Sequence, residues 1–222
     1  MLKRTVLNQL EAVLFDMDGL LVDTEPLWFE TEGEVMARLG GPWTREDQEA
    51  LLGGSMDNTV GYLLARATEP ALPAEVARWM MDGMLKRAAE GRVVVRPGAR
   101  ELLEEVAAAG VPCALVTGSQ RPFTEAVLAS TGFRFPVTVT ADDVTRTKPD
   151  PEPYLLAAKL LSAAPEKCVA LEDSPNGVMS AAGAGCRVIA VPSLLPIQPA
   201  PGRLVAQSLT EISLATLLSL VP

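Results

Sequence analysis

The chain has 222 residues, of which 48% are hydrophobic, so it is long enough to bury the core of one large domain or of a domain with an insertion. Its net charge of −9 repels nucleic acids and anionic membranes, so neither is expected as a partner. It contains no histidine, which excludes imidazole general bases, Ser-His-Asp hydrolases and His-ligated zinc.

The N-terminal residues, the lengths of the apolar segments and the cysteines indicate the cellular compartment. Polar residues interrupt residues 1–11, so no signal peptide is predicted, and no segment reaches the roughly 18 uninterrupted apolar residues of a membrane-spanning helix. Cys113, Cys168 and Cys186 lie in apolar strand-like runs and are expected to be buried thiols. These features predict a globular, cytoplasmic protein.

The first predicted strand, residues 12–15, is the apolar run Ala-Val-Leu-Phe, and it leads directly into Asp16, Asp18 and Gly19. A short apolar run bounded by a turn residue is typical of a strand buried in a parallel sheet. Ligands bind beyond the carboxyl ends of such strands, and side chains two positions apart point the same way, so both carboxylates can face one ligand. An Asp pair before Gly is also a common strand-ending turn, and this stretch alone does not decide between the two.

Residues 24–92 read as a helical insertion, which follows a short flap or hairpin at residues 19–23. Apolar residues recur there at helical spacing. Thr44, Ser55 and Pro73 stand where helices are expected to begin, because Ser and Thr cap helices and Pro suits their first turn. The pattern predicts four helices packed as a small bundle.

From about residue 93 the pattern returns to strands that alternate with helices, which is typical of a parallel sheet with crossover connections. Strands are predicted at residues 111–116, 136–140, 168–171 and 187–191, a Pro-rich loop at 192–201 and a closing helix at 209–220. The predicted fold class is therefore α/β, with a core domain of residues 1–23 and 93–222 and a helical domain of residues 24–92.

Three further groups of polar residues follow predicted strands of the core. The groups are Thr117, Gly118 and Ser119; Lys148; and Glu172 with Asp173. Each alone has an ordinary explanation as a turn, a solvated loop or a helix N-cap. Together with Asp16 and Asp18 they supply a nucleophile, hydroxyl and amide donors, a cation and metal ligands, which are the parts needed for phosphoryl transfer through a carboxylate. Asp16 and Asp173 suit Mg²⁺, which prefers carboxylate and other oxygen ligands.

These motifs carry a resemblance to a known family. FDMDG at residues 15–19 resembles the first motif of the haloacid dehalogenase-like (HAD) hydrolase superfamily. TKPDP at residues 147–151 is similar to its third motif, and LEDSPNG at residues 171–177 to its fourth. The resemblance covers essentially the whole chain. It implies a Rossmann-like parallel-sheet core with an inserted C1-type helical cap, and most members are Mg-dependent phosphatases.

The resemblance also implies roles for individual residues. Asp16 would attack phosphorus to form an aspartyl-phosphate, and Asp18 would protonate the leaving alcohol and then activate water. Mg²⁺ would be held by Asp16, Asp173 and the backbone carbonyl of Asp18, with Glu172 beside or just behind it. The residues expected to bind phosphate are Thr117, Gly118, Ser119 and Lys148.

The longer run FDMDGLLVDTEPLW at residues 15–28 resembles the β-phosphoglucomutase-like branch, and more closely its sugar-phosphate and hexitol phosphatases. The mutases of this branch carry a cap histidine at the position of Trp28 and a cap arginine near Met56, and this chain has neither. We therefore expect a phosphatase of a small phosphorylated metabolite, a sugar or polyol phosphate, that acts as a monomer or weak dimer. A sugar phosphomutase and a non-catalytic phosphate-binding regulatory protein are the alternatives.

Residues of the insertion are also candidates for the substrate-facing lip of the cap. These are Trp28, Gly53 with Gly54, and either Met56 or Trp43. Core packing for the tryptophans and a helix stop for the glycines explain them equally well.

Overall fold

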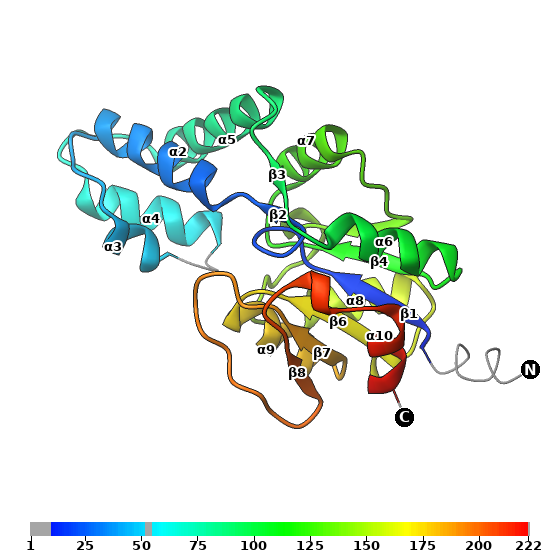
Figure 1. Cartoon of the computed structure of the whole chain (residues 1–222). Coiled ribbons are helices and arrows are strands. Elements are labelled where there is room, and N and C mark those ends of the chain that lie inside the picture. Colours follow the sequence, from blue (N-terminus) through cyan, green and yellow to red (C-terminus); the bar gives the residue numbers. More distant parts are fainter. Residues whose placement is uncertain (1–9, 52–54, 222) are drawn as a thin grey trace, which may run out of the picture.

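The computed structural model describes residues 10–51 and 55–221, and in this part six strands form one sheet in the order β5-β4-β1-β6-β7-β8 (Figure 1). Every pair of neighbours is parallel. The strands are β1 (Ala12–Phe15), β4 (Cys113–Val116), β5 (Val137–Val139), β6 (Cys168–Glu172), β7 (Arg187–Ala190) and β8 (Arg203–Val205). The predicted α/β fold class with a helical insertion is confirmed.

The register of the sheet aligns the carboxyl ends of its central strands. Phe15, the last residue of β1, is paired with Leu115 on β4 and with Leu171 on β6. The backbone amide of Asp16 still donates to the carbonyl of Leu171, at 3.1 Å. The polar residues that follow the three strands therefore emerge at one edge of the sheet.

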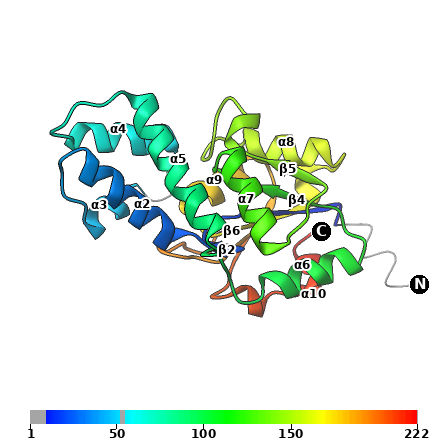
Figure 2. The same cartoon turned by 90° about the horizontal axis from the view of Figure 1, so that it is seen from above.

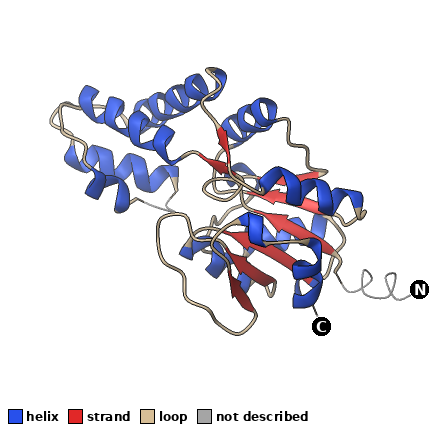
Figure 3. Cartoon of the chain, in the orientation of Figure 1, coloured by secondary structure: helices blue, strands red, loops and turns tan. Residues whose placement is uncertain are grey.

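Helices cover both faces of the sheet (Figure 3). Successive residues of β1 alternate between two apolar clusters, with Val13 and Phe15 in one and Ala12 and Leu14 in the other, because strand side chains point to opposite faces. The first cluster includes α6 (Ala99–Ala108), α7 (Arg121–Thr131) and α10 (Leu214–Leu220). The second includes α8 (Glu152–Leu160) and α9 (Pro175–Gly183).

The insertion lies to one side of the sheet (Figures 1 and 2). Its described residues form four helices, which we call the bundle. Its helices are α2 (Glu25–Arg38), α3 (Arg45–Glu49), α4 (Met56–Arg66) and α5 (Pro73–Ala89). Thr44 and Asp47 form a capping box, Ser55 caps α4, and Pro73 occupies the first turn of α5, as predicted. The bundle has its own apolar cluster, which contains Met36, Leu63 and Met80. The limits of the two predicted domains stay a prediction.

The chain enters and leaves the bundle through two adjacent short strands. β2 (Val22–Asp23) pairs antiparallel with β3 (Val94–Val95), with Val22 opposite Val95 and Asp23 opposite Val94. The predicted flap at residues 19–23 is a tight turn, which a hydrogen bond from the amide of Gly19 to the carbonyl of Val22 closes at 2.8 Å. Its strand, β2, pairs with β3, which lies about 70 residues further along the chain.

The C-terminal part differs from the sequence prediction in two places. β8 follows the Pro-rich loop and was not predicted, because its three residues are too few to show an alternating pattern. The closing helix is shorter than expected: a 3₁₀ turn, η3 (Leu209–Glu211), precedes α10, and the Ser213 hydroxyl caps α10 by accepting from the amide of Thr216. The other 3₁₀ turns are η1 (Ala141–Asp143) and η2 (Pro165–Lys167).

The expected burial of the cysteines is confirmed for two of the three, and it is wrong for Cys113, the first residue of β4. All three cysteines are free thiols; Cys168 and Cys186 are buried, and Cys113 is partly exposed. Among the described residues, every helix is too short or too polar to span a bilayer.

Replacement of Leu14 by alanine tests the sheet core. Leu14 is fully buried on β1, so we expect Leu14→Ala to lower the free energy of unfolding by about 3 kcal/mol. Leu204→Ala on β8 is the matched control, and because Leu204 is 37% exposed, its loss should stay below about 1 kcal/mol. Urea denaturation measures both, and equal losses would contradict the placement of β1 at the centre of the core.

Candidate active site

The site lies at the carboxyl ends of β1 and β6, where three buried carboxylates converge. Asp16, Glu172 and Asp173 each present an oxygen, and these oxygens all lie within 4.8 Å of one another. Asp16 and Asp173 are 157 residues apart in the sequence, and the register of β1 with β6 brings them together. They are near enough to share one cation. The side chain of Asp18 lies outside this cluster.

Lys148 links the carboxylates to the sheet. Its ammonium nitrogen donates to Asp16 Oδ1 at 2.6 Å, to Glu172 Oε1 at 2.6 Å and to the backbone carbonyl of Val116 at 2.8 Å. The hydroxyl of Tyr154, on α8, donates to the same Glu172 oxygen at 2.6 Å. Three acceptors satisfy the three N–H groups of the ammonium, so Lys148 is held in one position.

The carboxylates outnumber the positive charge that compensates them. Burial raises the pKa of Asp16 well above its usual range, against the pull of Lys148, and the charges of Glu172 and Asp173 add to the rise. Burial and the charge of Glu172 raise the pKa of Asp173 to about 8. Burial lowers the pKa of Lys148, but the negative charges of Asp16 and Glu172 raise it by more, so the pKa lies above its ordinary value. The site therefore has the charge imbalance that a further cation would relieve.

The donor atoms fit a hard divalent cation. Asp16 Oδ2 is buried and accepts no hydrogen bond from any described residue, although Asp16 Oδ1 is bound to Lys148. Asp173 Oδ2 accepts from the Ser193 hydroxyl at 2.5 Å and stands in the same cluster. Mg²⁺ prefers carboxylate and other oxygen ligands, and Asp16 Oδ2 could bind it without losing a hydrogen bond to the protein. Asp16 and Asp173 therefore fit Mg²⁺ by their chemistry, and the predicted ligand set stays a prediction.

Two glycines make room for the carboxylates. Gly19 has a φ of +80°, and a Cβ atom there would collide with the carboxylate of Asp173. A Cβ atom at Gly177, in the first turn of α9, would collide with the carboxylate of Glu172. The glycines of the first and fourth motifs are therefore required by the close approach of the backbone to the acidic cluster.

Asp18 is held by three hydroxyl groups from two segments, Thr24 and the loop at residues 117–119. The Thr24 hydroxyl donates to Asp18 Oδ1 at 2.6 Å, and the Ser119 and Thr117 hydroxyls donate to Asp18 Oδ2 at 2.7 and 3.1 Å. In this arrangement Thr117 and Ser119 orient Asp18, and their assignment to phosphate stays a prediction. The contact from Thr24, which precedes α2, was not found from the sequence because a Thr before a helix is expected to cap it.

A pocket opens between these groups and the bundle. Gly118, Ser119 and Lys148 line its core side together with Asp16, Asp18 and Asp173. On the bundle side it is lined by Glu25, Trp28, Glu32, Gln48, Leu51, Ser55, Met56 and Thr59. Trp28 and Met56, two of the candidate lip residues, therefore face the pocket.

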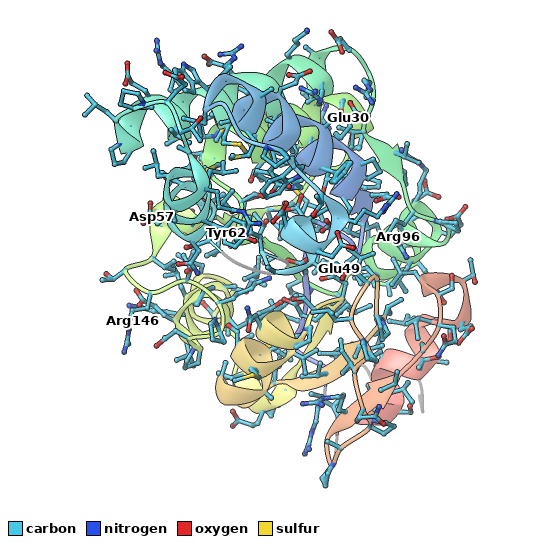
Figure 4. All side chains as sticks on the ribbon, turned by 90° about the vertical axis from the view of Figure 1, so that its left-hand side faces the viewer. Glu30, Glu49, Asp57, Tyr62, Arg96 and Arg146 are labelled. Carbon is cyan, nitrogen blue, oxygen red and sulfur yellow. The ribbon has the colours of Figure 1, made fainter. Side chains whose placement is uncertain are left out.

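Of the other candidate lip residues, Trp43 is described by the structure and does not line this pocket. Trp43 packs beside the bundle cluster, edge-on to Tyr62 with ring centroids 6.1 Å apart. Gly53 and Gly54 lie outside the described residues. Tyr62, labelled in Figure 4, comes from α4 and donates to Asp47 on α3 at 2.9 Å. This bond helps to fix α3, which carries Gln48 into the pocket wall.

Two glutamates of α2 belong to the pocket and were missed from the sequence. Burial raises the pKa of Glu32 to about 7, and burial together with the charge of Asp18 raises the pKa of Glu25 to about 7. Gln48 donates to the Glu25 carboxylate at 3.3 Å. Nothing in the sequence separates Glu32 from its neighbours Glu30 and Glu34, whose partners are Arg87 and Arg92 (Figure 4 labels Glu30).

Comparison with known proteins identifies the class to which this fold and site belong. The family model described as "Haloacid dehalogenase-like hydrolase" matches residues 13–191. The parallel sheet with its acidic cluster is thus the catalytic framework of a hydrolase. The chain belongs to the haloacid dehalogenase-like hydrolase family, and its phosphatase-named relatives make it a phosphoric monoester hydrolase.

Several relatives match over most of their length. Protein CbbY of Cereibacter sphaeroides is 38% identical over 194 residues, which cover 82% of this chain and 84% of the relative. Hexitol phosphatase A of Escherichia coli (strain K12) is 38% identical over 182 residues, 82% of each chain. The crystal structure of CbbY from Rhodobacter sphaeroides in complex with xylulose-1,5-bisphosphate is 33% identical, with a TM-score of 0.86 and coverage of 94% of this chain and 99% of that one.

Replacement of Glu32 by glutamine tests its burial. Its pKa rises from an ordinary 4.5 to about 7 in the fold, so the wild type loses stability as the pH rises between these values. Glu32→Gln has no charge to bury. On going from pH 4 to pH 8, we therefore expect its free energy of unfolding to rise by about 2 to 3 kcal/mol relative to that of the wild type.

The exposed Asp82 of α5 supplies the control. Asp82→Asn should change the free energy of unfolding by the same small amount at both pH values. Urea denaturation at pH 4 and pH 8 measures the difference, and a pH-independent effect of Glu32→Gln would show that Glu32 is not buried as a carboxylate.

Proposed function

We propose that this chain is a Mg²⁺-dependent phosphatase that hydrolyses a small sugar or polyol phosphate through an aspartyl-phosphate on Asp16. The observation that carries the proposal is the state of Asp16: one oxygen is fixed by Lys148, and the other is buried in the site without a donor. Its nearness to Asp173 supports a shared cation. The hexitol phosphatase among its relatives supports the substrate class.

In the first half-reaction, an oxygen of Asp16 forms a bond to phosphorus while the bond between phosphorus and the substrate's alcohol oxygen breaks. Lys148 holds the Asp16 carboxylate in one orientation, because its three hydrogen bonds leave it no freedom to move. The alcohol oxygen takes the proton of Asp18 as it leaves. The products are the free alcohol and phospho-Asp16.

In the second half-reaction, Asp18 takes a proton from a water molecule, whose oxygen attacks phosphorus as the bond to Asp16 breaks. Inorganic phosphate is released and Asp16 is restored as a carboxylate. The hydroxyls of Thr24, Thr117 and Ser119 orient Asp18 for both transfers. The same carboxyl group thus serves as acid first and as base afterwards.

Asp16, Asp173 and the backbone carbonyl of Asp18 would hold Mg²⁺, which would offset the charge of the phosphate and of the carboxylates. We assign Glu172 a place behind the ion, because Lys148 and Tyr154 occupy its Oε1 and the amide of Asp173 donates to its Oε2 at 3.1 Å. Its contribution is to hold Lys148 and the backbone in place.

We assign the transferring phosphate to the loop at residues 117–119 and to Lys148, which would act through its charge because its three N–H groups already have protein acceptors. Gly118 and Ser119 line the pocket just before α7, where backbone N–H groups at a helix start favour an anion. Gly118 has open space in place of a side chain, so a ligand can approach its backbone.

We assign residues 24–92 the role of a cap over the reacting groups, because the bundle supplies one wall of the pocket. A closed cap excludes water while Asp16 attacks and sorts leaving groups by size. Trp28 stands in that wall and has no group that could exchange a proton with a sugar hydroxyl, which supports water as the final acceptor rather than a second position on a sugar.

Asp16→Asn tests the nucleophile. An amide oxygen is a far weaker nucleophile than a carboxylate, so we expect phosphate release from p-nitrophenyl phosphate with Mg²⁺ to fall by about a thousandfold or more. The fold should persist, since the variant removes a buried charge, and circular dichroism and the melting temperature check this. Activity near the wild-type level would overturn the assignment of Asp16.

Removal of divalent cations tests the metal site. Dialysis against EDTA should abolish phosphate release, and added Mg²⁺ should restore it, because the carboxylates otherwise repel an anionic substrate. Asp173→Asn should raise the Mg²⁺ concentration for half-maximal rate by about tenfold or more, since it removes a ligand charge. Full activity in EDTA would contradict the cation dependence.

A further inference from the structure

The two sides of the pocket differ in charge. The core side carries Lys148 among its carboxylates. On the bundle side, the described lining residues include the two carboxylates of Glu25 and Glu32 and the amide of Gln48, with no lysine or arginine. The part of a substrate that extends from the phosphate toward the bundle therefore meets hydrogen-bond acceptors and negative charge.

Glu32 is the unusual member of this wall. Its residue is 4% exposed and lines the pocket, and no described residue donates to its Oε2. The neighbouring glutamates of α2 each have a cationic partner. Glu34 pairs with Arg87 at 2.7 Å, and Glu30 pairs with Arg87 and Arg92. The arginines of the bundle thus compensate the outer glutamates of α2 and leave Glu32 to the pocket.

A buried carboxylate oxygen without a donor is costly. The cost is visible in the pKa of Glu32, which burial raises to about 7. A hydroxyl group from a ligand in the pocket would supply the missing hydrogen bond. A second phosphate in its place would instead be repelled by Glu25 and Glu32, with no cation in the described wall to offset the charge.

We propose that Glu32 is a specificity-determining residue that accepts a hydrogen bond from a hydroxyl of the leaving group. The enzyme then selects monophosphates of uncharged, hydroxyl-rich alcohols and rejects substrates with a second phosphate. This inference rests on the proposed function, and it separates the chain from the CbbY relative whose structure holds a bisphosphate.

The test compares three substrates: a hexitol monophosphate such as glucitol 6-phosphate, a hexose bisphosphate such as fructose 1,6-bisphosphate, and p-nitrophenyl phosphate, whose leaving group has no further hydroxyl. The wild type should prefer the hexitol monophosphate over the bisphosphate by at least about tenfold in kcat/KM, since the pocket wall repels the second phosphate. Phosphate release with Mg²⁺ is measured for each.

Two substitutions separate recognition from folding. Glu32→Met removes the acceptor at similar length and should lower kcat/KM for the hexitol monophosphate by about tenfold or more, the loss of one hydrogen bond to a charged group. Glu32→Gln keeps an acceptor and should restore part of this loss. Both variants should lose less kcat/KM on p-nitrophenyl phosphate, which offers Glu32 no hydroxyl, than on the hexitol monophosphate. Both should also reduce the preference in kcat/KM for the monophosphate over the bisphosphate. Asp82→Asn, the exposed control on α5, should change none of these values.

The outcomes are distinct. Unchanged selectivity in Glu32→Met, or an equal loss on all three substrates, would overturn the assignment of Glu32 while p-nitrophenyl phosphate hydrolysis by the wild type keeps the proposed function intact. A wild type that prefers the bisphosphate would overturn it as well. If the wild type releases phosphate from no substrate, the proposed function fails, and this inference fails with it.

Discussion

The ammonium of Lys148, held between Asp16 and Glu172, is the interaction on which the site depends. The register of β1 with β6 forces the carboxylates that follow these strands into one buried place, where they repel one another. Lys148 offsets part of this negative charge and lies 2.6 Å from each of the two carboxylates. Hydroxyl groups donate hydrogen bonds to the carboxylates, and glycines leave space for them. The residues with these supporting contacts are Tyr154, Ser193, Thr24, Gly19 and Gly177. The remaining imbalance is one that a bound cation would relieve.

Most of this arrangement could be predicted from the sequence, because it depends on patterns within short runs of residues. An unbroken apolar run such as that of β1 indicates a strand buried on both faces, and polar residues at the ends of parallel strands must meet at one edge. The helix starts at Thr44, Ser55 and Pro73 are local in the same way, since capping depends on residues three positions apart. These features need no knowledge of long-range contacts.

The parts that escaped prediction depend on contacts between distant segments. β8 forms because a neighbour, β7, offers unpaired backbone groups to three residues that have no strand pattern of their own. The contact of Thr24 with Asp18 requires the turn at Gly19. Glu32 differs from Glu30 and Glu34 only through the position of Arg87 and Arg92, which follow on α5 and after it. A single run of sequence contains no record of such neighbours.

The pairing of β2 with β3 has a consequence for how such an enzyme can change. Seen from the core, these two strands are a hairpin, and residues 24–93 are its connecting loop. The entropy lost on closing a loop rises only with the logarithm of its length, so segments of very different size can occupy this position at little thermodynamic cost. The acidic cluster at the sheet edge and the pocket wall supplied by the bundle are therefore separable, and one can be exchanged by recombination while the other is inherited unchanged.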